Sequence, residues 1–254
     1  MKSKQKQNFL EWNNSILINS IKRINLSILS IIILDLLFYL SSGFLAVYWL
    51  QRIKIKLEYF NLPGDIAALG YDSAQMLLSN MKSFLYFVII SAALLLITII
   101  FLASIFKGII WAKTTKTKLS FNLISKFLGL NLIWMGFWFL ILFLIIYLVQ
   151  IQLVRAFMLI ALAAAVYFTN TLYTIFMKRQ KLSCIFDAIR LNITKIHMLA
   201  IPYAAIFILA LIILGLGNLL QFQYSAFVVG FVLVVYAAFV RYYASELALE
   251  LDKA

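Results

Sequence analysis

The chain has 254 residues, of which 65% are hydrophobic and 12% charged, and its formal net charge is +13. Soluble domains are about 45–50% apolar and about 25% charged, so this composition excludes a water-soluble globular class. Nucleic acid is excluded as a partner because the Lys and Arg residues lie in clusters between apolar segments and not in one basic domain. The apolar runs are long and unbroken, which predicts an all-α polytopic membrane bundle with the lipid bilayer as its main partner.

Residues 1–23 form a basic N-terminal segment in which Phe9, Trp12 and Ile16 recur at helical spacing before Lys22 and Arg23. Such a pattern is typical of an amphipathic helix that lies in the headgroup plane. The first apolar run follows over residues 24–50. It is too long for a signal-peptide core and has no small-residue cleavage site, so we expect a retained first span.

An outer loop is predicted over residues 51–83, before a second span at 84–111. In Arg52–Leu57 charged and apolar residues alternate, which indicates a short strand-like stretch. Pro63-Gly64 is a turn signal. Asp72 and Gln75 have the spacing of a capping box, so the second helix is expected to begin at residue 73, before its span.

The third and fourth spans are predicted at residues 127–149 and 153–177, with Gln150–Gln152 as the turn of a tight hairpin. The 45 residues between Lys195 and Arg241 carry no charge. As one helix they would be about 68 Å long, more than twice a hydrocarbon core of about 30 Å, so they must fold back. We place the reversal at residues 215–223, which gives spans at 196–220 and 222–247 and a short tail at 248–254.

The orientation follows from the Lys and Arg residues beside the spans. With the N-terminus inside, 17 of the 22 basic residues lie on the cytoplasmic side. Cytoplasmic loops carry the excess of Lys and Arg in membrane proteins. The distribution therefore predicts a plasma (cell) membrane protein with both termini in the cytoplasm.

Short amphipathic helices are expected before some of the hairpins. The clearest is at residues 182–196, where Leu182, Ile185, Phe186, Ile189, Ile193 and Ile196 fall on one helical face. The tripeptide Lys-Leu-Ser precedes both this segment, at 181–183, and the third span, at 118–120. A three-unit repeat of one interfacial helix and two spans is one interpretation, and chance similarity in a biased composition is the other.

Asp35 is the one ionisable residue deep within a predicted span. A carboxylate at that depth costs several kcal/mol unless it is protonated or has a partner. It could be a proton or cation site facing the bundle interior, or a protonated side chain that bonds to a neighbouring helix. Arg155 and Arg241 lie near span ends, where we expect both side chains to reach the headgroups and not to pair with Asp35.

Thr169, Asn170, Thr171 and Thr174 make the fourth span locally polar. Such residues hydrogen-bond helices together more often than they line a path. Asp35, Thr169, Asn170 and Thr174 are the candidates for an intramembrane polar site. The expected contacts to lipid headgroups are basic residues around the 182–196 segment: Lys178, Arg179, Lys181, Arg190 and Lys195.

No catalytic, metal or cofactor site is predicted. Cys184 is the single cysteine and His197 the single histidine, so neither a Cys-based nor a His-based metal cluster can form. The sequence has no HExxH, no phosphate-binding Gly-rich loop and no GxSxG elbow. We therefore expect a non-enzymatic component that organises the membrane or serves as an accessory subunit, with anionic lipids, another membrane protein or a second copy as partner. The alternative is a small transporter or channel that uses Asp35.

Overall fold

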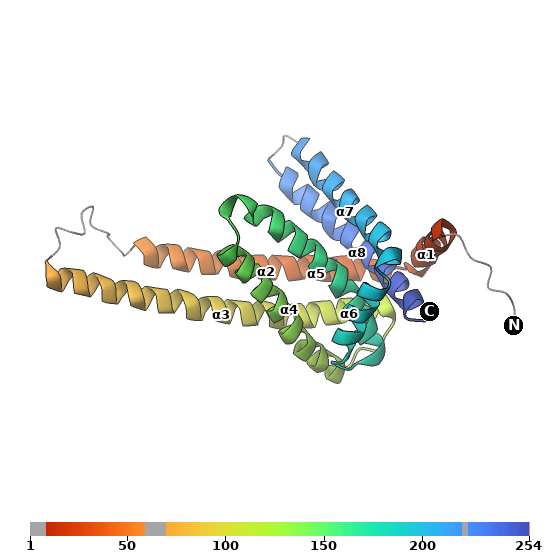
Figure 1. Ribbon diagram of the computed structural model, residues 1–254, viewed down its shortest axis with the longest axis horizontal. Coiled ribbons are helices and arrows are strands. Elements are labelled where there is room, and N and C mark those ends of the chain that lie inside the picture. The colour runs from red at the N-terminus through yellow and green to blue at the C-terminus, as the bar shows by residue number, and fades with distance from the viewer. Residues whose placement is uncertain (1–8, 59–69, 220–222, 254) are drawn as a thin grey trace. The chain divides into compact units, whose positions relative to one another are not determined.

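The computed structural model describes residues 9–58, 70–219 and 223–253, and all regular structure within these ranges is helical. Six of the described helices are long and apolar enough to cross a membrane: α2, α3, α4, α5, α7 and α8. The predicted fold class is therefore confirmed (Figure 1). The helices are α1 (Phe9–Arg23), α2 (Ser27–Glu58), α3 (Tyr71–Thr115), α4 (Phe121–Leu148), α5 (Ile151–Arg179), α6 (Cys184–Thr194), α7 (Ile196–Leu219) and α8 (Ser225–Leu251).

The chain divides into two compact units. Unit 1 comprises Met1–Leu36 and Ser104–Ala254, and unit 2 comprises Leu37–Ala103. Helices α2 and α3 each contribute one end to unit 1 and the rest to unit 2. All the side chains that form candidate sites below belong to unit 1.

Two antiparallel hairpins are the main elements of unit 1. Helices α4 and α5 pack together, as do α7 and α8, and α5 also packs on α8 (Figure 1). The turn between α4 and α5 is only Val149-Gln150, close to the predicted position. In the second hairpin Gly217 stays helical, and a Cβ added there would lie 2.4 Å from Cγ2 of Val229. This glycine allows α7 and α8 to approach closely, whereas the predicted reversal at residues 220–222 lies outside the described residues.

Burial in unit 1 is concentrated at one end, which we call the packed end. It contains the beginnings of α4 and α7 and the final parts of α5 and α8. The buried residues of α4 lie between Leu123 and Trp134, and those of α8 between Val234 and Leu251. In α5 they lie between Thr171 and Met177, apart from Ala161. The remaining halves of these hairpins expose apolar side chains, as expected of a helical bundle whose solvent is lipid.

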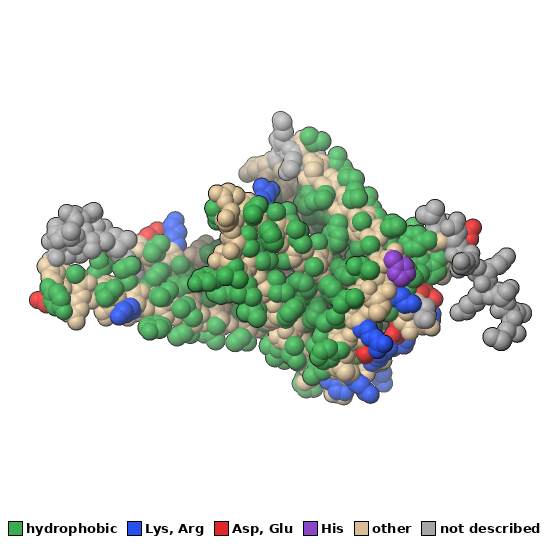
Figure 2. Space-filling model, in the orientation of Figure 1, with side chains coloured by type: hydrophobic (Ala, Val, Ile, Leu, Met, Phe, Trp, Pro, Cys, Tyr) green, Lys and Arg blue, Asp and Glu red, His purple; other side chains and the backbone are tan. Residues whose placement is uncertain are grey.

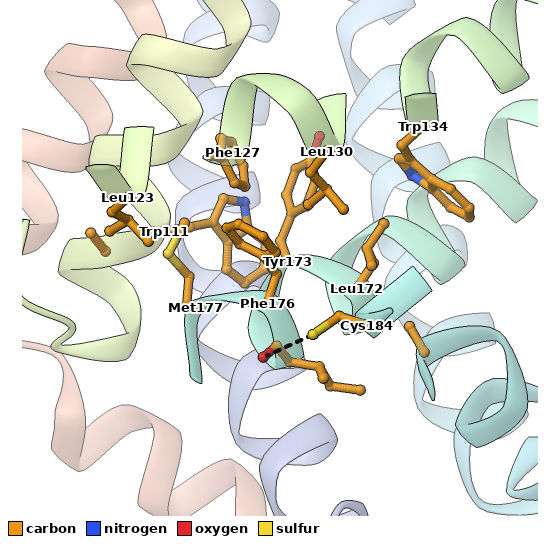
Figure 3. Close-up of a cluster of buried hydrophobic side chains, with 13 residues drawn as sticks. Trp111, Leu123, Phe127, Leu130, Trp134, Leu172, Tyr173, Phe176, Met177 and Cys184 are labelled. Atoms are coloured by element: carbon orange, nitrogen blue, oxygen red, sulfur yellow. Dashed lines mark hydrogen bonds between the residues drawn. The ribbon is translucent and has the colours of Figure 1, made fainter. Parts of the chain in front are cut away.

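The centre of the packed end is a cluster of buried side chains from α3, α4, α5 and α6 (Figure 3). The Tyr173 ring lies 4.8 Å from that of Phe127 and 5.7 Å from that of Trp111, measured between ring centroids. Gly108 of α3 faces this cluster, and a Cβ there would be 3.3 Å from Cδ1 of Phe127. Aromatic contacts at these distances add about 0.5–1.5 kcal/mol each to the energy of burial.

Helix α1 packs against α8, as its apolar spacing allows. Ile16 is buried in a cluster with Leu247. Arg23 forms an ion pair with Glu246, and the Tyr243 hydroxyl donates a hydrogen bond to the side chain of Asn13. The predicted N-terminal helix is therefore present and attached to the bundle.

Unit 2 is the hairpin of α2 and α3. The Trp49 indole N–H donates to the Ser91 hydroxyl at 3.0 Å, and the Lys56 ammonium lies 3.5 Å from the centroid of the Phe87 ring. Both helices are longer than the hydrocarbon core of a bilayer is thick, which is about 30 Å. Helix α3, with 45 residues, is about 68 Å long. Much of the predicted outer loop is therefore helical.

Two expectations for connecting segments were wrong. The stretch 52–57 is helical and not strand-like, because side chains four residues apart share a helical face there; Lys54 and Glu58 pair at 3.9 Å. Asp72 lies in the first turn of α3 and does not precede it. The two interpretations of the repeated Lys-Leu-Ser tripeptide differ here: residues 116–120 form no separate short helix, and Ser120 caps α4 itself by accepting a hydrogen bond from the Leu123 amide, which favours chance similarity.

Candidate functional site

The Asp35 side chain is fully buried at the packed end and has two cationic partners. One carboxylate oxygen lies 2.8 Å from Nη1 of Arg241 on α8, and the other lies 2.5 Å from Nζ of Lys107 on α3. The exposed side-chain fractions are 0% for Asp35, 8% for Arg241 and 16% for Lys107. This ion cluster joins three helices that are far apart in the sequence.

The position of Arg241 corrects the sequence-based expectation that it would reach the headgroups and not pair with Asp35. Helix α8 continues to Leu251, so Arg241 lies ten residues before its end. Tyr242 packs with Ile31 and Ile110, and this packing brings α8 against α2 and α3. Lys107 was not singled out from the sequence, and it lies on α3 eight residues before the end of that helix at Thr115.

The ion cluster carries one negative and two positive side chains, so its formal charge is +1. A buried carboxylate is stabilised when its charge is compensated and its oxygens accept hydrogen bonds, and here both oxygens do so. The arrangement is suited to holding α2, α3 and α8 in register. It differs from a proton-carrying site, where a carboxylate must exchange protons with water or a second acid.

The polar residues of α5 form contacts at a different place. The Thr169 hydroxyl accepts a hydrogen bond from the Trp134 indole at 2.8 Å, and the Thr174 hydroxyl donates to the Asn170 carbonyl one turn earlier. The Tyr203 hydroxyl on α7 lies against the Asn170 side chain. Among the described residues, none of the hydrogen bonds of these side chains reaches Asp35. The candidate polar set thus falls into two groups.

Two buried asparagines, neither of which was singled out from the sequence, connect further helices. The Asn131 side chain on α4 donates to the Ser104 hydroxyl at 3.0 Å and accepts from the Tyr173 hydroxyl at 2.6 Å. The Asn192 side chain on α6 accepts from the Thr171 hydroxyl at 2.9 Å. Amide groups surrounded by apolar residues at helical contacts are the signal that would have identified them.

Helix α6 has two faces at the packed end. Cys184, Ala188 and Asn192 are buried against its neighbours, while Phe186 is 77% and Ile193 60% exposed. Burial raises the pKa of the Cys184 thiol, which also points its Sγ at the Ile175 carbonyl at 4.0 Å (Figure 3). The thiol is therefore protonated and inaccessible, and α6 presents only its outer face.

The basic residues near α6 divide into paired and outward-facing groups. Lys178 and Arg179 both bind Asp252, at 3.0 and 2.6 Å, and Arg179 also binds Asp187 at 2.7 Å. Lys181, Arg190 and Lys195 have no acidic partner in the part of the chain that the structure describes; the first two are exposed and Lys195 is half-buried. Figure 2 shows Lys and Arg side chains gathered in this region of the visible face.

Metal binding has no support in the described ranges, where no group of three His, Cys, Asp or Glu side chains could hold an ion. No protein-family model, no curated protein and no solved structure matches the chain. The functional inference therefore depends on the geometry of this molecule alone.

Proposed function

We propose that the protein is a non-enzymatic component of the cell membrane that binds the anionic inner leaflet through its packed end. The observation that carries this proposal is the outer face of α6. There, exposed Phe186 and Ile193 lie on the same short helix as Arg190, between Lys181 and Lys195. An amphipathic helix with apolar and cationic side chains on its free face inserts at the boundary between headgroups and acyl chains.

The charge distribution supports a cytoplasmic location for the packed end. In the predicted topology 17 of 22 basic residues belong to this side. Each Lys or Arg near an anionic leaflet contributes about 1 kcal/mol to binding. Lys178 and Arg179 are already bound to acidic side chains, so they are left out of this sum. The three outward-facing cations in and beside α6, Lys181, Arg190 and Lys195, would then contribute about 3 kcal/mol in total.

A transport role for Asp35 has weaker support. Both oxygens of this carboxylate are held by cations, and polar side chains of α5 bond to helices α4 and α6. The polar groups of the bundle interior are thus largely used in holding helices together. A protein of this kind acts through what its surface binds, which favours a membrane-organising or accessory role over a catalytic or transport role.

The test measures lipid selectivity around the full-length protein in mixed vesicles of phosphatidylcholine and phosphatidylglycerol. Spin-labelled lipids report what fraction of each is immobilised at the protein surface. We expect a preference for phosphatidylglycerol that falls in the combined variant Lys181→Gln, Arg190→Gln and Lys195→Gln. The physical reason is the loss of three cations from the face that meets the headgroups.

The matched control removes three cations that the predicted topology assigns to the outer side and that have no acidic partner in the described ranges: Arg52→Gln, Lys56→Gln and Lys82→Gln. These residues belong to unit 2, and the control lowers the net charge by the same amount. Selectivity that falls equally in both variants would show a non-specific effect of net charge. Absence of selectivity in the wild-type protein would contradict the proposal directly.

A further inference from the structure

The second basic feature of the packed end lies where α2 meets α3. The Lys113 ammonium donates a hydrogen bond to the Ser30 hydroxyl at 3.1 Å, and the Ser30 hydroxyl donates to the Ser27 carbonyl. Lys113 is exposed, and no acidic side chain in the described ranges pairs with it. An ammonium group has three donors, so two remain after the bond to Ser30. Ser30 thereby holds a cation with unused donors at the α2/α3 contact.

The surroundings of Lys113 carry excess positive charge. Lys107 is six residues earlier on α3, about 9 Å along the helix, and belongs to the ion cluster with its formal charge of +1. Together with Lys113 the local charge is +2. The Debye length at physiological ionic strength is about 8 Å, and screening is weaker beside a low-dielectric bundle, so these charges act on the same ligand. The chemistry favours an anion with more than one acceptor oxygen.

The level of Lys113 in the membrane identifies the source of that anion. The charge-free segment Ser83–Phe106 has 24 residues, about 36 Å as a helix, and so covers the hydrocarbon core up to Lys107. Lys113 then lies beyond that boundary, at the depth of lipid phosphates. On α2, Ile33 lies one turn beyond Ser30 toward the hydrocarbon core and is 56% exposed, which provides an apolar surface for acyl chains.

We propose that one anionic phospholipid binds at the α2/α3 contact, with its phosphate on Lys113 and its acyl chains along Ile33. Ser30 is a positioning residue that fixes the ammonium group against α2. Lys107 and Arg241 supply attraction at longer range while they remain bound to Asp35. This site is separate from the α6 surface, holds a single lipid, and does not depend on the proposed function.

The experiment is native mass spectrometry of the full-length protein released from vesicles of phosphatidylcholine and phosphatidylglycerol. The wild-type protein should retain one phosphatidylglycerol under conditions that remove the others. Lys113→Gln should lower the affinity for this lipid about fivefold, the contribution of one cation near an anionic headgroup. Ser30→Ala should weaken retention less, because the ammonium group remains. The matched control is Lys118→Gln, an exposed lysine in the connection after α3.

Three further arms separate the outcomes. Excess glycerol phosphate or inorganic phosphate that displaces the lipid would assign the site to soluble phosphates and overturn the lipid assignment. Equal losses in Lys113→Gln and Lys118→Gln would overturn the site. The α6 triple variant should keep the single retained lipid although its surface selectivity falls, so that failure of one proposal is distinguishable from failure of the other.

Discussion

Removal of the Asp35 charge should destabilise the bundle more than removal of either of its cationic partners. Asp35→Asn changes the formal charge of the ion cluster from +1 to +2 and leaves two nearly buried cations without a counter-ion. Loss of one partner from a buried pair costs about 3–5 kcal/mol. Lys107→Met instead changes the charge from +1 to 0 and keeps the Asp35–Arg241 pair. Its cost should be on the order of 1–2 kcal/mol, because Lys107 is the more exposed partner and one charged hydrogen bond is lost.

The assay is equilibrium unfolding in mixed micelles, followed by the helical circular dichroism signal and by fluorescence of the buried tryptophans. Lys126→Met on the exposed face of α4 is the matched control and should change the unfolding free energy by less than about 0.5 kcal/mol. The double variant Asp35→Asn with Lys107→Met should be more stable than Asp35→Asn alone, because its cluster returns to +1. The reasoning would be refuted if Asp35→Asn were no more destabilising than Lys107→Met.

Further predictions concern packing and reactivity in unit 1. Gly217→Ala should destabilise the α7/α8 hairpin by about 1–3 kcal/mol, since its Cβ would lie 2.4 Å from Val229, and the added change Val229→Ala should restore most of the loss in the same unfolding assay. Asn131→Leu should lower the unfolding free energy by about 1–3 kcal/mol, because the buried Tyr173 and Ser104 hydroxyls lose their shared partner; an unchanged midpoint would exclude this role. Because burial raises the pKa of the Cys184 thiol above its ordinary 9.0, maleimide labelling should be slow in the folded protein and fast in denaturing detergent. Because the pKa of this thiol is higher in the folded than in the unfolded protein, its contribution to stability is present below pH 9 and is lost as the pH rises further. Comparison of the unfolding free energy of the wild type and the Cys184→Ser variant across this pH range would check the prediction.

The sequence was sufficient to predict six long apolar helices because each long apolar interval between basic clusters has the length of a membrane crossing. The short helix α6 was also predictable, since its apolar residues recur at three- and four-residue spacing and the helix forms at Cys184–Thr194. The orientation of that helix has a simple basis. Small side chains such as Ala188 pack against the bundle, and the large ones such as Phe186 remain outside.

The ion pairs of Asp35 could not be predicted from the sequence. The sequence gives the position of each charged residue along its helix, but not the direction in which its side chain points. Arg241 was expected to reach the headgroups and Lys107 was not singled out, yet both side chains turn inward to Asp35. A long side chain at such a position can reach the surface or turn inward to a partner, and the choice depends on the neighbouring helix. The alternating stretch 52–57 failed for a related reason, since six residues fit both a strand period and a helical face.

Depth measurement at Phe186 tests the central claim most directly, namely that α6 lies in the leaflet at the packed end. A nitroxide attached at this position in the full-length protein is compared with one at Arg190 by collision with oxygen and with a water-soluble nickel complex. We expect the Phe186 probe to lie about 5–10 Å into the headgroup and acyl boundary, with oxygen collisions dominant, and the Arg190 probe to lie closer to water. Dominant collisions with the nickel complex at Phe186, equal to those at Arg190, would contradict the claim.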